Sequence, residues 1–320
     1  MIVKKLENID YKEYPVIIFG SGPAGITVAL ELEKNNINSI IIEAGGEFYS
    51  DESQEFYKGS TNKNLISDIS ESRLRQFGGT TGTWGGWCKP LETFNLKGWP
   101  ITSESLKRYQ SKTCEILNIK NQFRNVPISK NFNQIEFQYS DVRFYDKYEE
   151  HIKKSKKIIL VLNTQLSYFE GNDKNVKTAI CISGNEIKKI NSKFFILSCG
   201  GIENSRILLW SKVKSPMLLK DNLPIGKYWM SHSWILAGAG VIDEKKLAKI
   251  MNNSYLDYEG PLHIASNENF KNIERILSGA VYMNKKENEK IYKEIIKDIL
   301  CIAPEYGKKI ASMIFNKSLK

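Results

Sequence analysis

The chain has 320 residues, of which 41% are hydrophobic and 26% charged, a balance typical of a globular protein rather than a disordered one. This length fits one large α/β unit or two domains. The sequence contains no run of about 18 uninterrupted apolar residues, so we expect no membrane-spanning helix. Charged residues follow Met1 almost at once, so we also expect no secretory signal peptide.

The formal net charge is +10, yet only seven of the 46 basic residues are arginine. Sequence-specific readers of DNA depend more on arginine, and the lysines here are spread along the whole chain, so we expect no nucleic-acid partner. The five cysteines are widely spaced without a Cys-x-x-Cys pair, and the three histidines are isolated. We therefore predict reduced thiols, a cytoplasmic location and no protein-bound metal.

The first strong structural signal runs from residue 14 to residue 46. A short β-branched run at 16–19 predicts a buried strand, and a glycine-rich turn at 20–25 follows it directly. Apolar residues at helical spacing then continue to Asn35, and a second buried strand at 39–42 ends at Glu43. A strand, a helix and a second strand in this order predict a parallel sheet.

Each glycine of the turn has a mechanical reason in a dinucleotide site. Gly20 permits the sharp exit from the strand, Gly22 lets a pyrophosphate approach the backbone, and Gly25 lets the helix pack closely on the sheet. The helix N-terminus, opened by Pro23, offers N–H groups to phosphate oxygens. Glu43, 18 residues after Gly25, would accept the ribose hydroxyls and repel a 2′-phosphate. The turn predicts a dinucleotide without that phosphate and leaves NAD and FAD open.

The remaining elements are expected in the following order. Residues 47–76 look polar and irregular, 78–86 are dense in glycine, and Thr102 is a predicted helix N-cap. Residues 119–150 show no clear period. We predict strands at 158–162, 176–182, 194–198 and 235–242, a helix at 203–210, and helices throughout the lysine-rich stretch beyond residue 243, with Pro304 separating the last two.

Several sequence blocks together resemble the glucose-methanol-choline (GMC) flavin oxidoreductases. The blocks are Glu43-Ala44-Gly45-Gly46, the run from Arg75 to Gly86, Trp99-Pro100, the run from Ile196 to Leu209 and, more loosely, the run from Leu223 to His232. They occur in the order found in that family and cover about residues 12 to 242. The resemblance decides between the two cofactors in favour of FAD, because a nicotinamide site does not require the glycine block at 78–86.

The resemblance implies a Rossmann-like α/β FAD-binding domain, formed by residues 12–100 and 155–242, with a partial substrate-side region at 101–154 and 243–320. It implies non-covalent FAD, because Thr83 stands where some members carry the histidine that bonds to the flavin. The implied FAD-contacting residues are Gly20, Ser21, Gly22, Pro23, Ala24, Gly25, Glu43, Ala44, Arg75, Gly78, Gly79, Thr80, Thr81, Trp84, Gly85, Gln165, Leu166, Cys199, Gly200 and Gly201.

The family oxidises a CH–OH group, here expected on a small alcohol such as a sugar or polyol, by hydride transfer to the flavin N5. The base is a histidine near the C-terminus, and no matching block follows Val241. His232 and His263 are weak candidates for a base, and His151 is expected on the surface, so the catalytic residues stay unassigned.

Two alternatives remain open at this point. The chain is a truncated product or one half of a split enzyme, inactive without a C-terminal partner chain, or it is an NAD-dependent dehydrogenase. The lysine-rich tail at 284–320 fits a solvated helix packed on the domain, an amphipathic helix on a membrane surface, or the middle of a substrate domain whose remaining sheet is absent. The electron acceptor and the oligomeric state are not encoded in any pattern we recognise.

Overall fold

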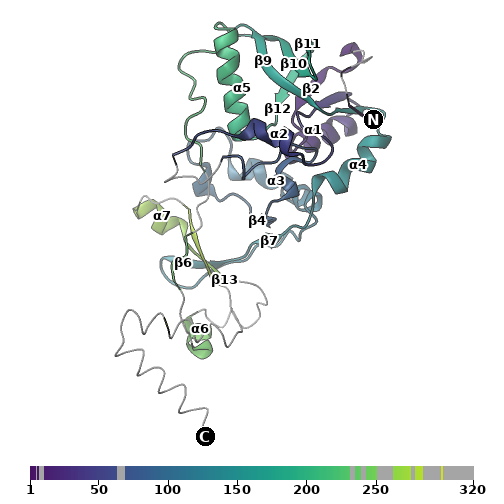
Figure 1. The fold of residues 1–320 in the computed structure, drawn as a ribbon. Helices are drawn as coiled ribbons and strands as arrows, with labels where there is room; N and C mark the ends of the chain where they lie inside the picture. The colour runs from purple at the N-terminus through teal and green to yellow at the C-terminus, as the bar shows by residue number, and fades with distance from the viewer. Residues whose placement is uncertain are drawn as a thin grey trace. The chain divides into compact units, whose positions relative to one another are not determined.

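The computed structural model describes residues 1–4, 6, 11–62, 69–230, 235–238, 243–250, 262–274, 278–283 and 297 (Figure 1). The chain divides into two compact units, which we describe separately. The first unit is Met1–Gly86 with Asp141–His232, and the second is Trp87–Ser140 with Ser233–Lys320.

A five-stranded parallel sheet forms the centre of the first unit. Its strand order is β1-β8-β3-β2-β12, and each neighbouring pair is parallel. The strands are β1 (Ile2–Val3), β8 (Ile158–Val161), β3 (Ser39–Ile42), β2 (Val16–Phe19) and β12 (Phe194–Leu197). The prediction of an α/β fold with a parallel sheet is confirmed, and the strands expected at 16–19, 39–42, 158–162 and 194–198 are present to within one residue.

The central strands are continuous apolar runs because both of their faces are covered. Ile17, Ile18, Ile40, Ile41 and Leu160 are each 0% exposed. Uninterrupted branched apolar residues of this kind are typical of parallel strands, which bury both faces, and they distinguish such strands from the alternating pattern of a half-exposed sheet. Helix α1 (Pro23–Lys34) makes the crossover from β2 to β3 and ends at Asn35, as expected.

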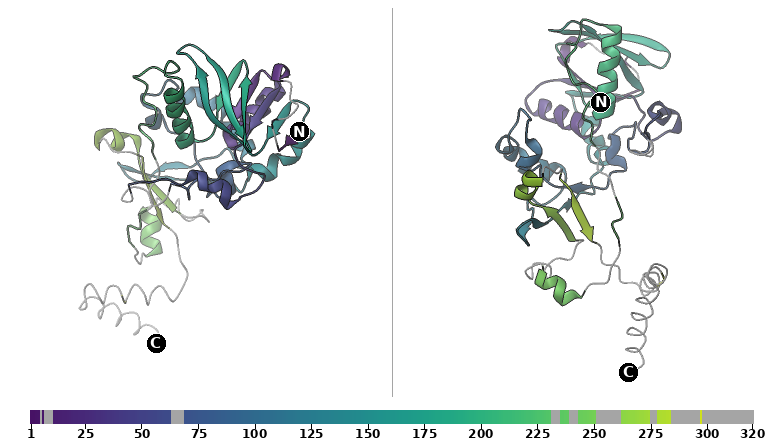
Figure 2. Two further views of the ribbon diagram at one scale, coloured as in Figure 1. Left: turned by 45° about the horizontal axis from the view of Figure 1, so that its top comes forward. Right: turned by 90° about the vertical axis from the view of Figure 1, so that its left-hand side faces the viewer.

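A second, antiparallel sheet completes the first unit. It has the order β11-β10-β9, with β9 (Thr164–Gly171), β10 (Val176–Ser183) and β11 (Glu186–Asn191). Helix α5 (Gly201–Lys214) lies beside β9 (Figure 2), where the Ser211 hydroxyl accepts a hydrogen bond from the Phe169 N–H at 2.9 Å. The helix was predicted over 203–210 and is longer at both ends.

The other elements of the first unit are short, apart from one helix. They are η1 (Tyr11–Glu13), α2 (Asp51–Gln54), η2 (Glu55–Tyr57), η3 (Gly79–Gly82) and α4 (Phe144–Lys154). Helix α4 belongs to this unit, whereas the sequence placed residues 101–154 in the substrate-side region.

The second unit contains a four-stranded antiparallel sheet of order β14-β13-β6-β5 and a two-stranded sheet β4-β7. Its strands are β4 (Trp87–Cys88), β5 (Asn125–Pro127), β6 (Phe132–Ile135), β7 (Gln138–Tyr139), β13 (Leu262–Ser266) and β14 (Ala280–Met283). Its helices are η4 (Thr93–Leu96), α3 (Ser103–Ile116), α6 (Glu244–Ile250) and α7 (Glu268–Glu274). Thr102 caps α3 as predicted, accepting from the Ser105 N–H at 3.2 Å.

The prediction of helices throughout the stretch beyond residue 243 is wrong at β13 and β14. These strands form because β13 pairs with β6, about 130 residues earlier in the chain, and a pairing over that distance leaves no local periodicity to detect. The strand expected at 235–242 is not formed at 235–238, and residues 239–242 lie outside the described residues, as do the helices expected around Pro304.

In the described ranges, no helix is both long enough and apolar enough to cross a bilayer.

Candidate dinucleotide site

The glycine turn at 20–25 is required by the fold at its two ends. Gly20 has φ +97°, and a Cβ there would lie 2.6 Å from the Ser198 carbonyl oxygen. A Cβ on Gly25 would lie 2.0 Å from the Gly20 carbonyl oxygen and 2.6 Å from the Ser198 hydroxyl. The strand-to-helix turn therefore has no room for a side chain at either position.

Gly22 is different, because nothing in the protein requires a glycine there. Its φ of −72° suits any residue, and a Cβ would meet no atom within 4 Å. Gly22 is the N-cap of α1 but supplies no side-chain cap, and Pro23 and Ala24 after it are exposed. The open space lies where N–H groups at the start of a twelve-residue helix face outward, which suits an anionic ligand.

The second glycine block packs directly on this turn. The Gly78 N–H donates to the Ser21 carbonyl oxygen at 3.1 Å. A Cβ on Gly79 would lie 3.0 Å from the Gly22 Cα. The Phe77 N–H donates to the Gly46 carbonyl oxygen at 2.9 Å, and the Phe77 ring is fully buried. The structure thus brings together two glycine segments that are more than 50 residues apart in the sequence.

The polar side chains of this block already have partners within the protein. The buried Thr81 hydroxyl donates to the Gly78 carbonyl oxygen at 2.7 Å and accepts from the Phe144 N–H at 3.1 Å. The Thr80 hydroxyl accepts from the Leu74 N–H, and the Trp84 indole N–H donates to the Val142 carbonyl oxygen. The two threonine hydroxyls were expected to reach the ligand. The buried Thr81 hydroxyl spends its hydrogen within the loop, whereas the exposed Thr80 hydroxyl accepts there and can still donate to a ligand, as can the backbone of the exposed Gly85.

Glu43, the residue that follows β3, is 6% exposed. One carboxylate oxygen accepts from the Ser21 N–H at 2.9 Å and the Ser21 hydroxyl at 2.7 Å, and the other accepts from the Gly45 N–H at 2.8 Å. A carboxylate has about four acceptor positions, so one is left for a hydroxyl donor. The next residue, Ala44, is partly exposed.

Arg75 and Gln165 are paired beside this carboxylate. An Arg75 Nη donates to the Gln165 side-chain oxygen at 2.9 Å, and the other Nη donates to the Ser53 hydroxyl at 2.8 Å. Burial lowers the pKa of the Arg75 guanidinium, and the Glu43 charge opposes that shift. Leu166 packs in the hydrophobic core, so that its backbone, rather than its side chain, is what it can offer to a nucleotide.

Cys199 precedes the turn that opens α5. Its Sγ lies 3.2 Å from the Phe19 carbonyl oxygen, and burial, reinforced by the Glu43 charge, raises the pKa of the Cys199 thiol to about 12. The next residue, Gly200, has φ +83° and caps α5 without a side-chain hydrogen bond. These contacts favour a packing role for the thiol.

The raised pKa predicts slow alkylation of Cys199 while the chain is folded. At pH 8 a thiol of this pKa is ionised in about one molecule in ten thousand. We expect iodoacetamide at pH 8 to leave the Cys199 peptide unlabelled in the folded chain and to label it fully in urea, as measured by peptide mass spectrometry. Rapid labelling of the folded chain would contradict this account of the turn.

Two of the three histidines lie within the described residues. His151, on α4, is half-exposed and lies 2.6 Å from a Glu33 carboxylate oxygen, which confirms its surface position. His263, on β13 in the second unit, is 3% exposed and packs against Trp87, Phe137 and Tyr282 with ring centroids 5.0, 4.9 and 5.2 Å away. His232 lies outside the described residues.

The described ranges contain no cluster of three or more His, Cys, Asp or Glu side chains that suits a metal ion.

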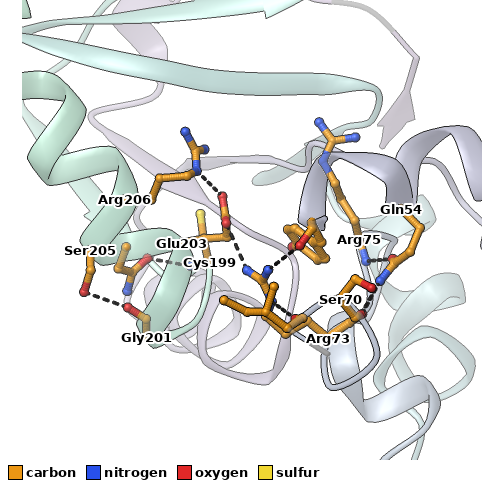
Figure 3. A network of polar contacts seen from close by, with 12 residues as sticks. Gln54, Ser70, Arg73, Arg75, Cys199, Gly201, Glu203, Ser205 and Arg206 are labelled. Atoms are coloured by element: carbon orange, nitrogen blue, oxygen red, sulfur yellow. Dashed lines mark hydrogen bonds and ion pairs between the residues drawn. The ribbon is translucent and has the colours of Figure 1, made fainter. Parts of the chain in front are cut away.

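Sequence reasoning missed a buried ion-pair network in the first unit (Figure 3). Arg73 and Arg206 both bind the Glu203 carboxylate, with Arg73 Nη1 at 2.9 Å and Arg206 Nε at 2.8 Å from its two oxygens. Glu203 lies two residues after Gly201, and the acid with Arg206 three residues later, in a block bounded by apolar runs, was the available signal.

Comparisons with known proteins find similarity in solved structures. No family model and no curated protein sequence matches the chain. Pyridoxine 4-oxidase from Mesorbium loti shares 11% identity, with a TM-score of 0.42 over 63% of this chain and 52% of that one. An FAD-dependent oxidoreductase from Chaetomium thermophilum shares 13% identity, with a TM-score of 0.46 over 64% of this chain and 48% of that one. A fungal aryl-alcohol oxidase shares 11% identity, with a TM-score of 0.42 over 62% of this chain and 48% of that one. The chain spans about half the length of these structures.

Proposed function

We propose that this chain binds FAD non-covalently and is an FAD-dependent oxidoreductase of the GMC type. The observation that carries the proposal is the open space at Gly22. A glycine that the fold does not need lies at the N-terminus of α1, next to Ser21, which bonds to both Glu43 and the Gly78 N–H. A bound dinucleotide explains why a side chain is absent there, and a purely structural turn does not.

The residues of the first unit fit FAD in the following way. The turn at 20–25 would hold the pyrophosphate through backbone N–H groups and the α1 N-terminus. Glu43 would accept a ribose hydroxyl at its remaining acceptor position, and the backbone at Gly78 and Gly79 would continue along the ligand. Arg75 with Gln165, and the turn at 199–201, would border the adenosine end.

FAD, when bound, would supply the acceptor for a hydride leaving a CH–OH carbon. The residues of this chain would then have two tasks, to orient the dinucleotide and to keep water from its phosphates. We propose a small alcohol, such as a sugar or polyol, as the substrate. If the chain is one half of a split enzyme, a C-terminal partner chain would carry the catalytic base.

Two further parts of the proposal concern how FAD is attached and where the chain is located. Thr83, in the position of the covalent attachment in some GMC members, is exposed and has a hydroxyl that does not form the histidyl bond, which supports non-covalent FAD. Cys88, Cys114, Cys181 and Cys199 are free thiols, which supports the proposed cytoplasmic location.

A ligand comparison tests the proposal. We expect flavin-free protein to quench the fluorescence of added FAD and to be saturated by it, with NAD competing weakly or not at all. Tight binding of NAD without binding of FAD would favour a dehydrogenase and overturn the proposal.

A further inference from the structure

One short segment connects the polar network of Figure 3 to the glycine block. We call residues 69–76 the strap. The Arg75 carbonyl oxygen lies so close to Gly45 that a Cβ there would be 2.0 Å from it, and Gln76 forms a parallel β-bridge with Gly46. The strap therefore lies against the residues that follow Glu43 and leads directly into Phe77 and Gly78.

Arg73 organises the strap from within. Its Nε donates to the Ile69 carbonyl oxygen at 2.9 Å, and its Nη2 donates to the Tyr57 carbonyl oxygen at 3.1 Å. The guanidinium carbon lies 4.0 Å from the centroid of the Tyr57 ring. Gln54 adds bonds to the carbonyl oxygens of Ser70 and Arg73, at 2.8 and 2.6 Å. These contacts shape the strap but do not attach it to α5.

The remaining nitrogen of Arg73 attaches the strap to α5. Nη1 donates to a Glu203 oxygen at 2.9 Å, with the two side chains 14% and 11% exposed. The other Glu203 oxygen accepts from Arg206, whose side chain is 53% exposed. Glu203 thus carries a buried bond to the strap and a solvent-screened bond within its own helix. Loss of the carboxylate charge would leave a buried guanidinium without its counter-charge.

We propose that Glu203 is a positioning residue for the dinucleotide, because it fixes the strap, and through it the Glu43–Gly46 segment and the Gly78 backbone, relative to the first turn of α5. This inference rests on the proposed function. Glu203 itself lies in the helix turn that begins at Gly201. Its carboxylate therefore links the first turn of α5, the Glu43–Gly46 segment and the Gly78 backbone, which are all expected to border FAD.

The test compares two variants that act on the same carboxylate. Glu203→Gln weakens both ion pairs, whereas the matched control Arg206→Gln removes only the exposed one. We expect Glu203→Gln to raise the Kd for FAD by on the order of tenfold to a hundredfold, as misplacement of binding groups does elsewhere. Arg206→Gln should leave the Kd within about threefold, because exposed ion pairs contribute little. Arg73→Lys keeps the positive charge but loses the fork of hydrogen bonds that the guanidinium donates, so it should behave like Glu203→Gln. If Glu203→Gln does not fold, Arg73→Lys takes its place in the test.

Amide hydrogen exchange of residues 69–76 in the flavin-free protein supplies a readout that needs no ligand. Exchange should be faster in Glu203→Gln and unchanged in Arg206→Gln. Wild-type Kd and wild-type protection in Glu203→Gln would overturn the role of Glu203 while leaving the proposed function intact. Wild-type protein that binds no FAD would overturn the proposed function, and with it this role, whatever the exchange shows.

Discussion

Replacing Gly22 by valine is expected to abolish FAD binding at micromolar concentrations without unfolding the chain. A Cβ at this position meets no atom within 4 Å and the backbone angle is ordinary, so we expect the fold to accept the side chain. The same side chain would fill the space through which a phosphate approaches the α1 N-terminus. We expect the Kd for FAD to rise by at least about a hundredfold, a loss of about 2.7 kcal/mol.

Flavin fluorescence titration measures this effect, and far-UV circular dichroism with thermal unfolding checks the fold. The matched control is Gly22→Ala, whose single methyl group should reduce affinity less than valine does. If Gly22→Val binds FAD as tightly as the wild type, the open space at Gly22 is not the phosphate site, and the assignment of the turn is wrong.

Replacing Gly25 by alanine is expected to have the opposite outcome, a large loss of stability. The added Cβ would lie 2.0 Å from a backbone carbonyl oxygen, and neither α1 nor β2 can move away without disturbing the buried sheet. Overpacking of a tight core costs about 1–3 kcal/mol and sometimes more, and a clash with backbone belongs at the upper end. We expect a loss of about 3 kcal/mol, seen as a Tm lower by roughly 6–12 °C.

Gly22→Ala is again the control, because it makes the same chemical change three residues earlier. Alanine is a poorer N-cap than glycine but restricts the unfolded chain, and these small effects oppose each other, so its stability should stay within about 1 kcal/mol of the wild type. Equal destabilisation by the two substitutions would contradict the division of the turn into structural and ligand-facing glycines.

The central strands of the first unit and the helix between them could be predicted from the sequence because their signals are local. The four apolar residues before Gly20 and the three isoleucines before Glu43 are enough to define the two central strands, and Asn35 ends the helix between them. Gly20 and Gly25 were assigned to turn and packing, and the structure places each where a side chain cannot fit.

The features that were missed depend on contacts distant in sequence. β13 forms by pairing with β6, and β14 pairs with β13, so neither strand could be predicted from its own few residues. Arg73 and Glu203 are 130 residues apart, so no spacing rule joins them. The Thr81 hydroxyl of the glycine block bonds within the protein, and its contact with Phe144 from α4 could not be predicted from the block itself.

The central claim, that this chain is a flavoprotein with non-covalent FAD, is tested most directly by the visible absorption spectrum of the purified chain. Protein with or without added FAD is freed of unbound flavin, scanned, denatured and filtered. We predict a flavin spectrum that stays with the folded protein and passes the filter as free FAD after denaturation. A colourless protein that also takes up no added FAD would contradict the claim, and flavin that stays on the denatured chain would contradict the non-covalent attachment.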